Sequence, residues 1–121
     1  MIDPQVRACI AAIVAAVAKG RDPKTIYDHG QSRHVTISGR LNPDRVSLYD
    51  HDRSCHVGGR VSGRKLSLYD FGRSQHISLT IEGEKFKGYD FGVSAHFTGS
   101  VRGRSVTLYD FSESEWTHYS N

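Results

Sequence analysis

The sequence predicts a mainly β domain, an antiparallel up-and-down meander of about ten strands built from hairpin repeats of about 20 residues, with one N-terminal helix packed on its aliphatic, concave face. The first observation is a recurring Tyr-Asp pair, whose tyrosines are Tyr27, Tyr49, Tyr69, Tyr89 and Tyr109. A serine follows five residues after each tyrosine, and a histidine or tryptophan follows two residues later. Fixed-period self-similarity indicates one small unit stacked on copies of itself, so the 121 residues form a single domain.

The second observation is a helical segment, residues 4–20, ahead of the repeat array at residues 25–120. Asp3 and Pro4 form a typical N-cap followed by proline at the first helical position, and Lys19-Gly20 is a typical stop. The helix therefore covers residues 4–19. Bulky aliphatic side chains fall on one stripe and alanines on the other, so we expect burial on the stripe and at least partial cover elsewhere.

The apolar run at residues 8–18 also has the length of a signal-peptide core, although no basic cluster precedes it. It is too short to span a bilayer. Cys9 and Cys55 lie in segments of different kind without framework spacing, which indicates two free thiols in a reducing compartment. We expect a cytoplasmic protein, with an export signal in residues 1–18 as the alternative.

From residue 25 onward the hydrophobic period changes from 3.6 to 2, which is typical of strands. Two-residue hairpin turns are expected at Gly63-Arg64, Gly83-Glu84 and Gly103-Arg104. The first repeat carries two extra residues at Asn42-Pro43-Asp44, which predicts a longer loop. Joints between repeats, such as residues 72–75, are short and polar and offer glycine for a left-handed backbone position.

Pairing the strands assigns the aliphatic side chains to one face. The expected register of one hairpin is Val57 opposite Asp70, Gly59 opposite Leu68 and Val61 opposite Leu66. Gly39, Gly59 and Gly99 recur at the middle of this face, where we expect the helix backbone to approach closely. Ten strands span roughly 45 Å, and a helix of this length is about 24 Å long. Either the sheet curls strongly, as an open sheet or a barrel, or a second chain covers the remainder. That second chain would be a protein partner or another copy of this protein, packed on the helix and the aliphatic face.

The aspartates of the five Tyr-Asp pairs lie on the aliphatic face beside the joints. A short acceptor next to a tight polar loop typically accepts hydrogen bonds from the loop amides. Carboxylates on alternate strands are about 9.6 Å apart, which is too far to converge on one calcium ion. Equivalent Asp, Ser and His residues in every repeat suit a lattice, whereas a catalytic triad needs one asymmetric pocket. We therefore expect no enzyme and no cofactor.

The opposite face carries rows of rings that run across the strands. One row is expected to read His29, His34, His51, His56, Phe71, His76, Phe91, His96, Phe111, Trp116. A second row alternates the tyrosines with small residues, namely Thr36, Gly58, Ser78 and Thr98. The rows act either as ladders that stabilise the meander or as an exposed stacking platform. We predict a non-catalytic binding or scaffolding module that uses His34, His56, His76, His96, Trp116, Tyr49, Tyr69, Tyr89 and Tyr109.

Three other ligand classes remain open on this face. Four consecutive histidines, His29, His34, His51 and His56, form the expected metal-binding alternative, against the simpler interpretation that histidine replaces phenylalanine as a flat ring. Basic residues near the hairpin turns, together with the rings, resemble a weak single-stranded nucleic-acid platform. Acidic residues interrupt that basic strip, so nucleic acid is unfavoured. A glycan or another small ligand on the rings completes the alternatives.

Overall fold

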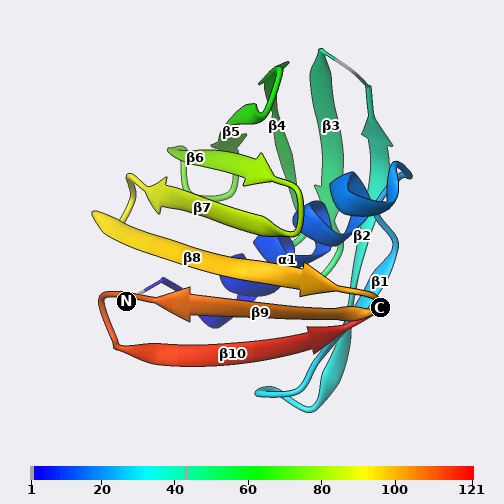
Figure 1. The fold of residues 1–121 in the computed structure, drawn as a ribbon. Coiled ribbons are helices and arrows are strands. Elements are labelled where there is room, and N and C mark those ends of the chain that lie inside the picture. Colours follow the sequence, from blue (N-terminus) through cyan, green and yellow to red (C-terminus); the bar gives the residue numbers. More distant parts are fainter. Residues whose placement is uncertain (1, 43) are drawn as a thin grey trace.

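A computed structural model, which describes residues 2–42 and 44–121, shows a closed ten-stranded antiparallel barrel around one helix (Figure 1). The helix α1 spans Pro4–Lys19. The strands are β1 Thr25–Asp28, β2 Arg33–Leu41, β3 Arg45–Asp50, β4 Cys55–Ser62, β5 Lys65–Asp70, β6 Gln75–Glu82, β7 Lys85–Asp90, β8 Ala95–Arg102, β9 Ser105–Asp110 and β10 Glu115–Ser120. The predicted meander and its N-terminal helix are confirmed.

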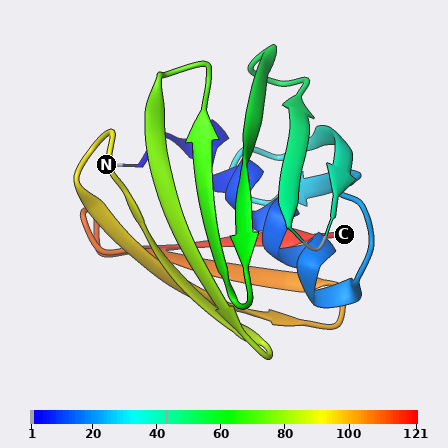
Figure 2. The ribbon, with the colours of Figure 1, turned by 90° about the horizontal axis from the view of Figure 1, so that it is seen from above.

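The barrel closes because its first and last strands pair. Tyr27 lies opposite Ser120 and Asp28 opposite Tyr119, so β1 and β10 complete the ring. Figure 2 shows α1 inside the ring of strands. The aliphatic face is therefore the interior and the ring-bearing face is the exterior. A closed barrel leaves no unpaired sheet edge, and no second chain is needed to cover the aliphatic face.

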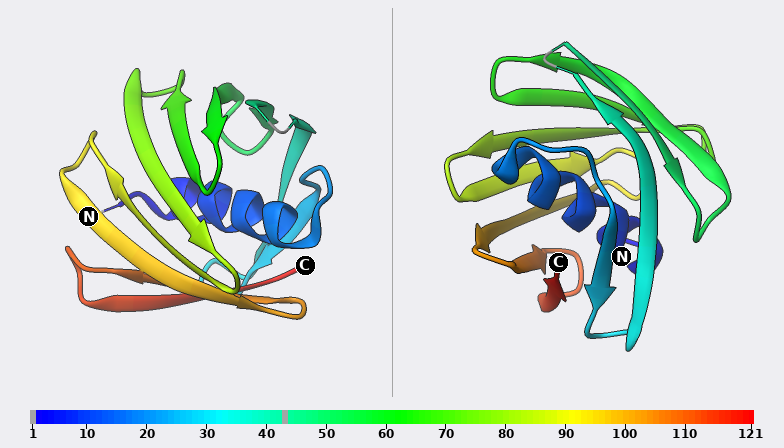
Figure 3. Two further views of the ribbon diagram at one scale, coloured as in Figure 1. Left: turned by 45° about the horizontal axis from the view of Figure 1, so that its top comes forward. Right: turned by 90° about the vertical axis from the view of Figure 1, so that its right-hand side faces the viewer.

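Helix α1 is buried around its whole circumference between Val6 and Ala16 (Figure 3). The alanines explain this, because their small side chains let the strands pack closely on the side opposite the aliphatic stripe. The Asp3 carboxylate accepts a hydrogen bond from the Gln5 amide at 2.8 Å, and Gly20 ends the helix at φ 63°. Among the described residues, no helix is long and apolar enough to cross a membrane.

The barrel has two unlike ends. At the turn end, two-residue turns join the strands, and their first residues Gly63, Gly83 and Gly103 adopt φ of 59°, 60° and 55°, as expected for glycine. At the joint end, four-residue segments connect successive repeats, at residues 29–32, 51–54, 71–74, 91–94 and 111–114.

The joints correct one expectation, because their left-handed residue is serine and not glycine. The residues concerned are Ser32, Ser54, Ser74, Ser94 and Ser114, with φ between 51° and 55°. Gly72 does not adopt a positive φ. Its amide instead donates to Asp70, so glycine at this place is not required for backbone conformation. The fixed position of serine within the repeat is the signal that marked the left-handed residue.

The first hairpin departs from the others and supplies extra stagger. Pro43 lies outside the described residues, but its neighbours Asn42 and Arg45 bond each other through their backbones at 2.9 and 3.4 Å. The two extra residues therefore lengthen the hairpin and shift its register. Tyr49 lies opposite Ser38, not in line with Thr36 as expected, whereas the equivalent Tyr69 lies opposite Gly58.

The rows of rings are consequently not straight. In each regular repeat the tyrosine lies opposite the residue two places beyond the histidine of the preceding strand, as Tyr89 lies opposite Ser78 and not His76. Two pairs have an offset of four places instead of two. In the first hairpin Tyr49 lies opposite Ser38, four places beyond His34, and in the closing pair Tyr27 lies opposite Ser120, four places beyond Trp116. Barrel closure requires such stagger, and the sequence expectation of straight rows missed it.

The expected approach of the helix to the mid-strand glycines is wrong. A Cβ atom at Gly59 would lie 2.0 Å from the Ser67 carbonyl oxygen, and one at Gly99 would lie 2.0 Å from the Thr107 oxygen and 2.4 Å from the Phe86 ring. Gly39 likewise faces the Ser47 oxygen, which would lie 2.3 Å from a Cβ. These glycines let neighbouring strands approach and bend, and they leave room for a core ring.

Candidate functional site

The exterior of the joint end carries five clusters of three rings, one per repeat, which we call ring trios. Each trio has a central tyrosine with one ring from the joint and one from the following strand. The trios are Tyr27/His29/His34, Tyr49/His51/His56, Tyr69/Phe71/His76, Tyr89/Phe91/His96 and Tyr109/Phe111/Trp116. The centroid of each flanking ring lies between 4.6 and 4.9 Å from the centroid of the central tyrosine.

The register explains each trio. Tyr69 lies directly opposite His76, and Phe71 follows two residues after Tyr69 at the start of the joint. Both flanking rings meet the tyrosine edge to face at 4.8 Å, an arrangement that aromatic quadrupoles favour. The tyrosine is half-buried between them. The nine residues predicted to bind a partner therefore all point outward, with the histidines and Trp116 exposed and the tyrosines half-covered.

The first two trios differ from the last three. His29 and His51 replace phenylalanine, and their Nε2 atoms lie 2.7 Å from the hydroxyls of Ser120 and Ser38. The corresponding phenylalanines remain open to solvent. Phe71, Phe91 and Phe111 are 60 %, 55 % and 54 % exposed, and Trp116 is 56 % exposed. We call these four rings the aromatic patch.

A shallow groove of about 650 Å³ adjoins the aromatic patch on the outer surface of β6 to β9. Gly88 and the buried Phe97 line the groove on β7 and β8, and Tyr89, Phe111 and Lys87 line it beside them. Polar groups complete its lining, namely those of Ser78, Thr80, His96 and Thr98. The groove thus combines flat rings with hydroxyl, imidazole and ammonium groups within one surface.

The four histidines predicted as a metal row are divided between two trios. His29 and His34 flank Tyr27, and His51 and His56 flank Tyr49. In residues 2–42 and 44–121, no group of three or more His, Cys, Asp or Glu side chains lies close enough together to hold a metal ion.

The interior of the joint end carries the aspartates of the Tyr-Asp pairs, all buried. Each accepts a hydrogen bond from the backbone amide two residues later, as expected. The distances are 2.9 Å for Asp28, 3.0 Å for Asp50, 3.0 Å for Asp70, 2.9 Å for Asp90 and 2.9 Å for Asp110. These bonds hold the joints in shape from inside the barrel.

Two arginines connect three of these carboxylates into one buried ionic chain. Arg53 bonds Asp50 at 2.8 Å and Asp70 at 2.7 Å, and Arg73 bonds Asp70 at 2.7 Å and Asp90 at 3.0 Å. Burial favours the neutral acid, but the hydrogen bonds from Arg73 and Arg53 outweigh it and hold the pKa of Asp70 below its usual value of 3.8. This contribution to stability is present above pH 3.8 and is lost as the pH falls below it.

The sequence expectation missed this ionic chain. The sequence signal for this chain is an arginine three residues after the aspartate in the second and third joints. The other three joints carry Gln31, Val93 and Glu113 at that position. The fifth joint uses the helix instead. Asp110 accepts a hydrogen bond from the Ile2 amide at 3.0 Å, and the buried Arg7 guanidinium lies 3.9 Å from the same carboxylate. Burial opposes ionisation, but bonds from Ser112 and Ile2 lower the pKa of Asp110.

Both cysteines are free, and Cys9 lies inside the barrel close to the ionic chain. Burial, reinforced by the negative charge of Asp50, raises the pKa of Cys9 to about 12. Burial also raises the pKa of Cys55, whose Sγ lies 3.8 Å from Asp70 Oδ1. Since the thiolate is the reactive form, neither cysteine is a candidate nucleophile.

Comparison of the chain with protein-family models, with curated proteins and with solved structures finds no match.

Proposed function

We propose that this chain is a non-catalytic binding module and that the aromatic patch, with the groove beside it, is its binding surface. The observation that carries the proposal is the exposure of Phe71, Phe91, Phe111 and Trp116, each more than half open to solvent. Four large rings in neighbouring repeats form an apolar surface, and such surfaces mark interaction sites. The first two repeats, by contrast, carry hydrogen-bonded histidines at the phenylalanine position.

A saccharide is the ligand class that this surface suits best. Sugar rings have an apolar face that stacks on aromatic rings, and their hydroxyls need hydrogen-bonding partners at the edge of the stack. Phe111 and Tyr89 offer the rings, while Thr98, His96 and Lys87 offer the polar groups beside them. Equivalent trios recur on alternate strands, about 9.6 Å apart on a flat sheet. A ligand built of repeating units fits such an array.

Self-association through the helix and the aliphatic face is not carried into this proposal. Both surfaces lie inside the closed barrel and are covered by the chain itself. We also place the protein in a reducing compartment such as the cytoplasm, a proposal supported by its two free cysteines.

The chain offers its own reporter for the test, because Trp116 is its single tryptophan and belongs to the patch. Titration with a panel of neutral and acidic oligosaccharides should shift Trp116 emission for at least one member. Phe111→Ser should weaken that binding about tenfold, which corresponds to roughly 1.4 kcal/mol of lost stacking.

The matched control is His51→Ser, at the equivalent position of the second repeat, which should leave the affinity unchanged. If no oligosaccharide alters the emission at millimolar concentration, the saccharide class is wrong. If His51→Ser weakens binding as much as Phe111→Ser, the aromatic patch is not the site.

A further inference from the structure

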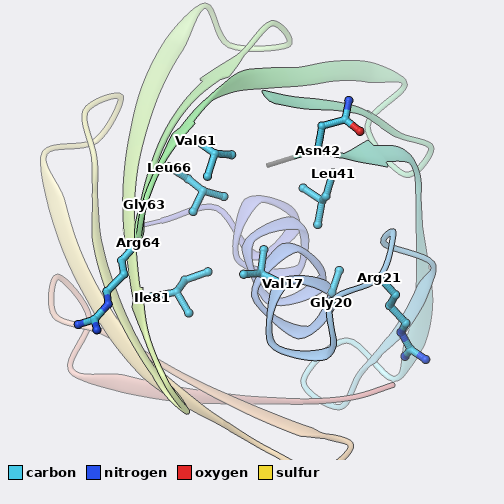
Figure 4. A pocket seen from close by; sticks show the side chains of 11 residues that line it. Val17, Gly20, Arg21, Leu41, Asn42, Val61, Gly63, Arg64, Leu66 and Ile81 are labelled. Atoms are coloured by element: carbon cyan, nitrogen blue, oxygen red, sulfur yellow. The ribbon is translucent and has the colours of Figure 1, made fainter. Parts of the chain in front are cut away.

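The turn end of the barrel contains a cavity that is separate from the outer surface. It has a volume of about 480 Å³ and opens between the end of α1 and the strands β2, β4, β5 and β6. Figure 4 shows the side chains of Val17, Leu41, Val61, Leu66 and Ile81 pointing toward this common space. Aliphatic side chains from the helix and from four strands therefore line the cavity.

The cavity exists because the helix stops before it fills the mouth. Gly20 ends α1, and the chain turns away through Arg21. The space between Leu41 on one wall and the Val61–Leu66 pair on the other lies beyond this helix end. Leu66 is buried, while Val17, Leu41 and Val61 are only partly covered. Partly covered aliphatic side chains around an open cavity can gain burial from a ligand.

The turn end of the barrel, where this cavity opens, is rich in basic residues. Twelve of the sixteen Lys and Arg residues lie at the turn end, namely at the helix end, in the helix–β1 connection, in the turns or in the adjacent halves of the strands. Four of the thirteen acidic residues lie in the same region. The basic residues are Lys19, Arg21, Lys24, Arg40, Arg45, Arg60, Arg64, Lys65, Lys85, Lys87, Arg102 and Arg104. The acidic ones are Asp22, Asp44, Glu82 and Glu84.

Two of these arginines border the cavity itself. Arg21 and Arg64 are exposed, and their guanidinium groups point away from the aliphatic lining in Figure 4. Long exposed arginine side chains change rotamer without disturbing the fold, so either group can turn over the mouth. A carboxylate held there would gain a charge-assisted hydrogen bond without entering the apolar interior.

We propose that this cavity binds the aliphatic chain of a single-chain anionic amphiphile of the fatty-acid type, with its carboxylate at the basic mouth. The aliphatic lining favours a hydrocarbon tail, and the nearby positive charge favours a negatively charged head group. The site is independent of the aromatic patch, because the patch lies outside the barrel and the cavity lies within its turn end.

Calorimetric titration with dodecanoate, dodecanol and dodecyltrimethylammonium tests both parts of the proposal, with the two ionic amphiphiles below their micellar concentrations and dodecanol below its solubility limit. Dodecanoate should bind at one site, dodecanol at least tenfold more weakly, and the cationic amphiphile not measurably. Equal binding of all three would overturn the proposed role of the basic mouth, and no binding of dodecanoate would overturn the site.

Variants locate the binding. Val61→Phe and, separately, Val17→Phe fill the cavity from the wall and from the helix, and each should abolish dodecanoate binding while the variant still melts cooperatively. Two separate variants are made because one introduced phenylalanine could disturb the packing and prevent that variant from folding. Unchanged binding in a folded cavity-filling variant would place the ligand elsewhere and refute the proposal.

The chain also offers a matched pair for the head group. Arg64 and Arg104 are the second residues of equivalent two-residue turns, but only Arg64 lines the cavity. Arg64→Glu should weaken dodecanoate binding about tenfold, and Arg104→Glu, with the same change in net charge, should weaken it less than twofold. If both variants weaken binding equally, the effect comes from the net charge of the protein, and the proposed head-group site at Arg64 is wrong. Phe111→Ser should leave dodecanoate binding unchanged, which separates this test from that of the aromatic patch.

Discussion

The two ends of the barrel are built on the same ten strands but are held together in different ways. At the joint end, every strand connection is fixed from inside by a buried aspartate, and Arg53 and Arg73 join three of these aspartates into one ionic chain. At the turn end, glycine-initiated turns join the strands mainly through backbone pairing, and an apolar cavity remains open between them.

One repeated hairpin is therefore held by buried carboxylates at one end and by short backbone turns at the other. Buried charged groups are costly unless each is paired and hydrogen-bonded, so the joint end tolerates little change. The charged side chains of the two-residue turns are exposed, so the turn end can vary in sequence and in side-chain position.

Removing the central carboxylate of the ionic chain should have the largest effect. Asp70→Ala leaves the half-buried Arg53 and Arg73 guanidinium groups without their shared partner and the Gly72 amide without an acceptor. We expect the free energy of unfolding to fall by about 3–5 kcal/mol. The measurement is urea denaturation followed by circular dichroism.

The control for Asp70→Ala removes an acidic residue from the turn end. Glu84 is exposed, so Glu84→Ala should change the free energy of unfolding by less than about 0.5 kcal/mol. Similar losses at both positions would contradict the contrast between the two ends.

Alkaline pH should weaken the protein through Cys9. Its pKa is about 12 in the folded state and 9.0 ordinarily, so above pH 9 the unfolded chain loses a proton that the folded chain keeps. Stability should then fall by about 1.4 kcal/mol per pH unit. Cys9→Ala should remove most of this slope between about pH 9 and 10. Since Cys55 is less buried, Cys55→Ala should change the slope of stability against pH less than Cys9→Ala does. An unchanged slope in Cys9→Ala would assign the alkaline loss to another group.

The left-handed residues should respond in opposite directions at the two ends. Ser74 at φ 55° in a joint is strained by its Cβ, so Ser74→Gly should raise the free energy of unfolding by up to about 1 kcal/mol. Gly63 at φ 59° in a turn has open space where a Cβ would lie, so Gly63→Ala should lower it by about 1 kcal/mol through backbone strain alone. Thermal melts measure both changes, and a loss of stability in Ser74→Gly would show that the serine hydroxyl has a structural role.

The repeat pattern and the helix caps predicted the local structure of this protein. The Tyr-Asp period predicted the hairpins, the strand number and the pairing of Val57, Gly59 and Val61 with their partners, all of which the structure confirms. The caps at Asp3 and Gly20 predicted the helix. These features depend on interactions between residues close in sequence, so a single repeat contains the information for them.

Barrel closure and stagger, in contrast, depend on contacts that form only in the folded sheet. The pairing of β1 with β10 joins residues that are far apart in the chain, and no repeat encodes it. The two-place offset in each regular repeat groups the rings into separate trios, and the first hairpin widens this offset at Ser38. The bonds of Arg53 and Arg73 to the aspartates of the next joint form because successive joints lie side by side at one end of the barrel. Such contacts depend on how the whole sheet curves, which is a property of all ten strands together.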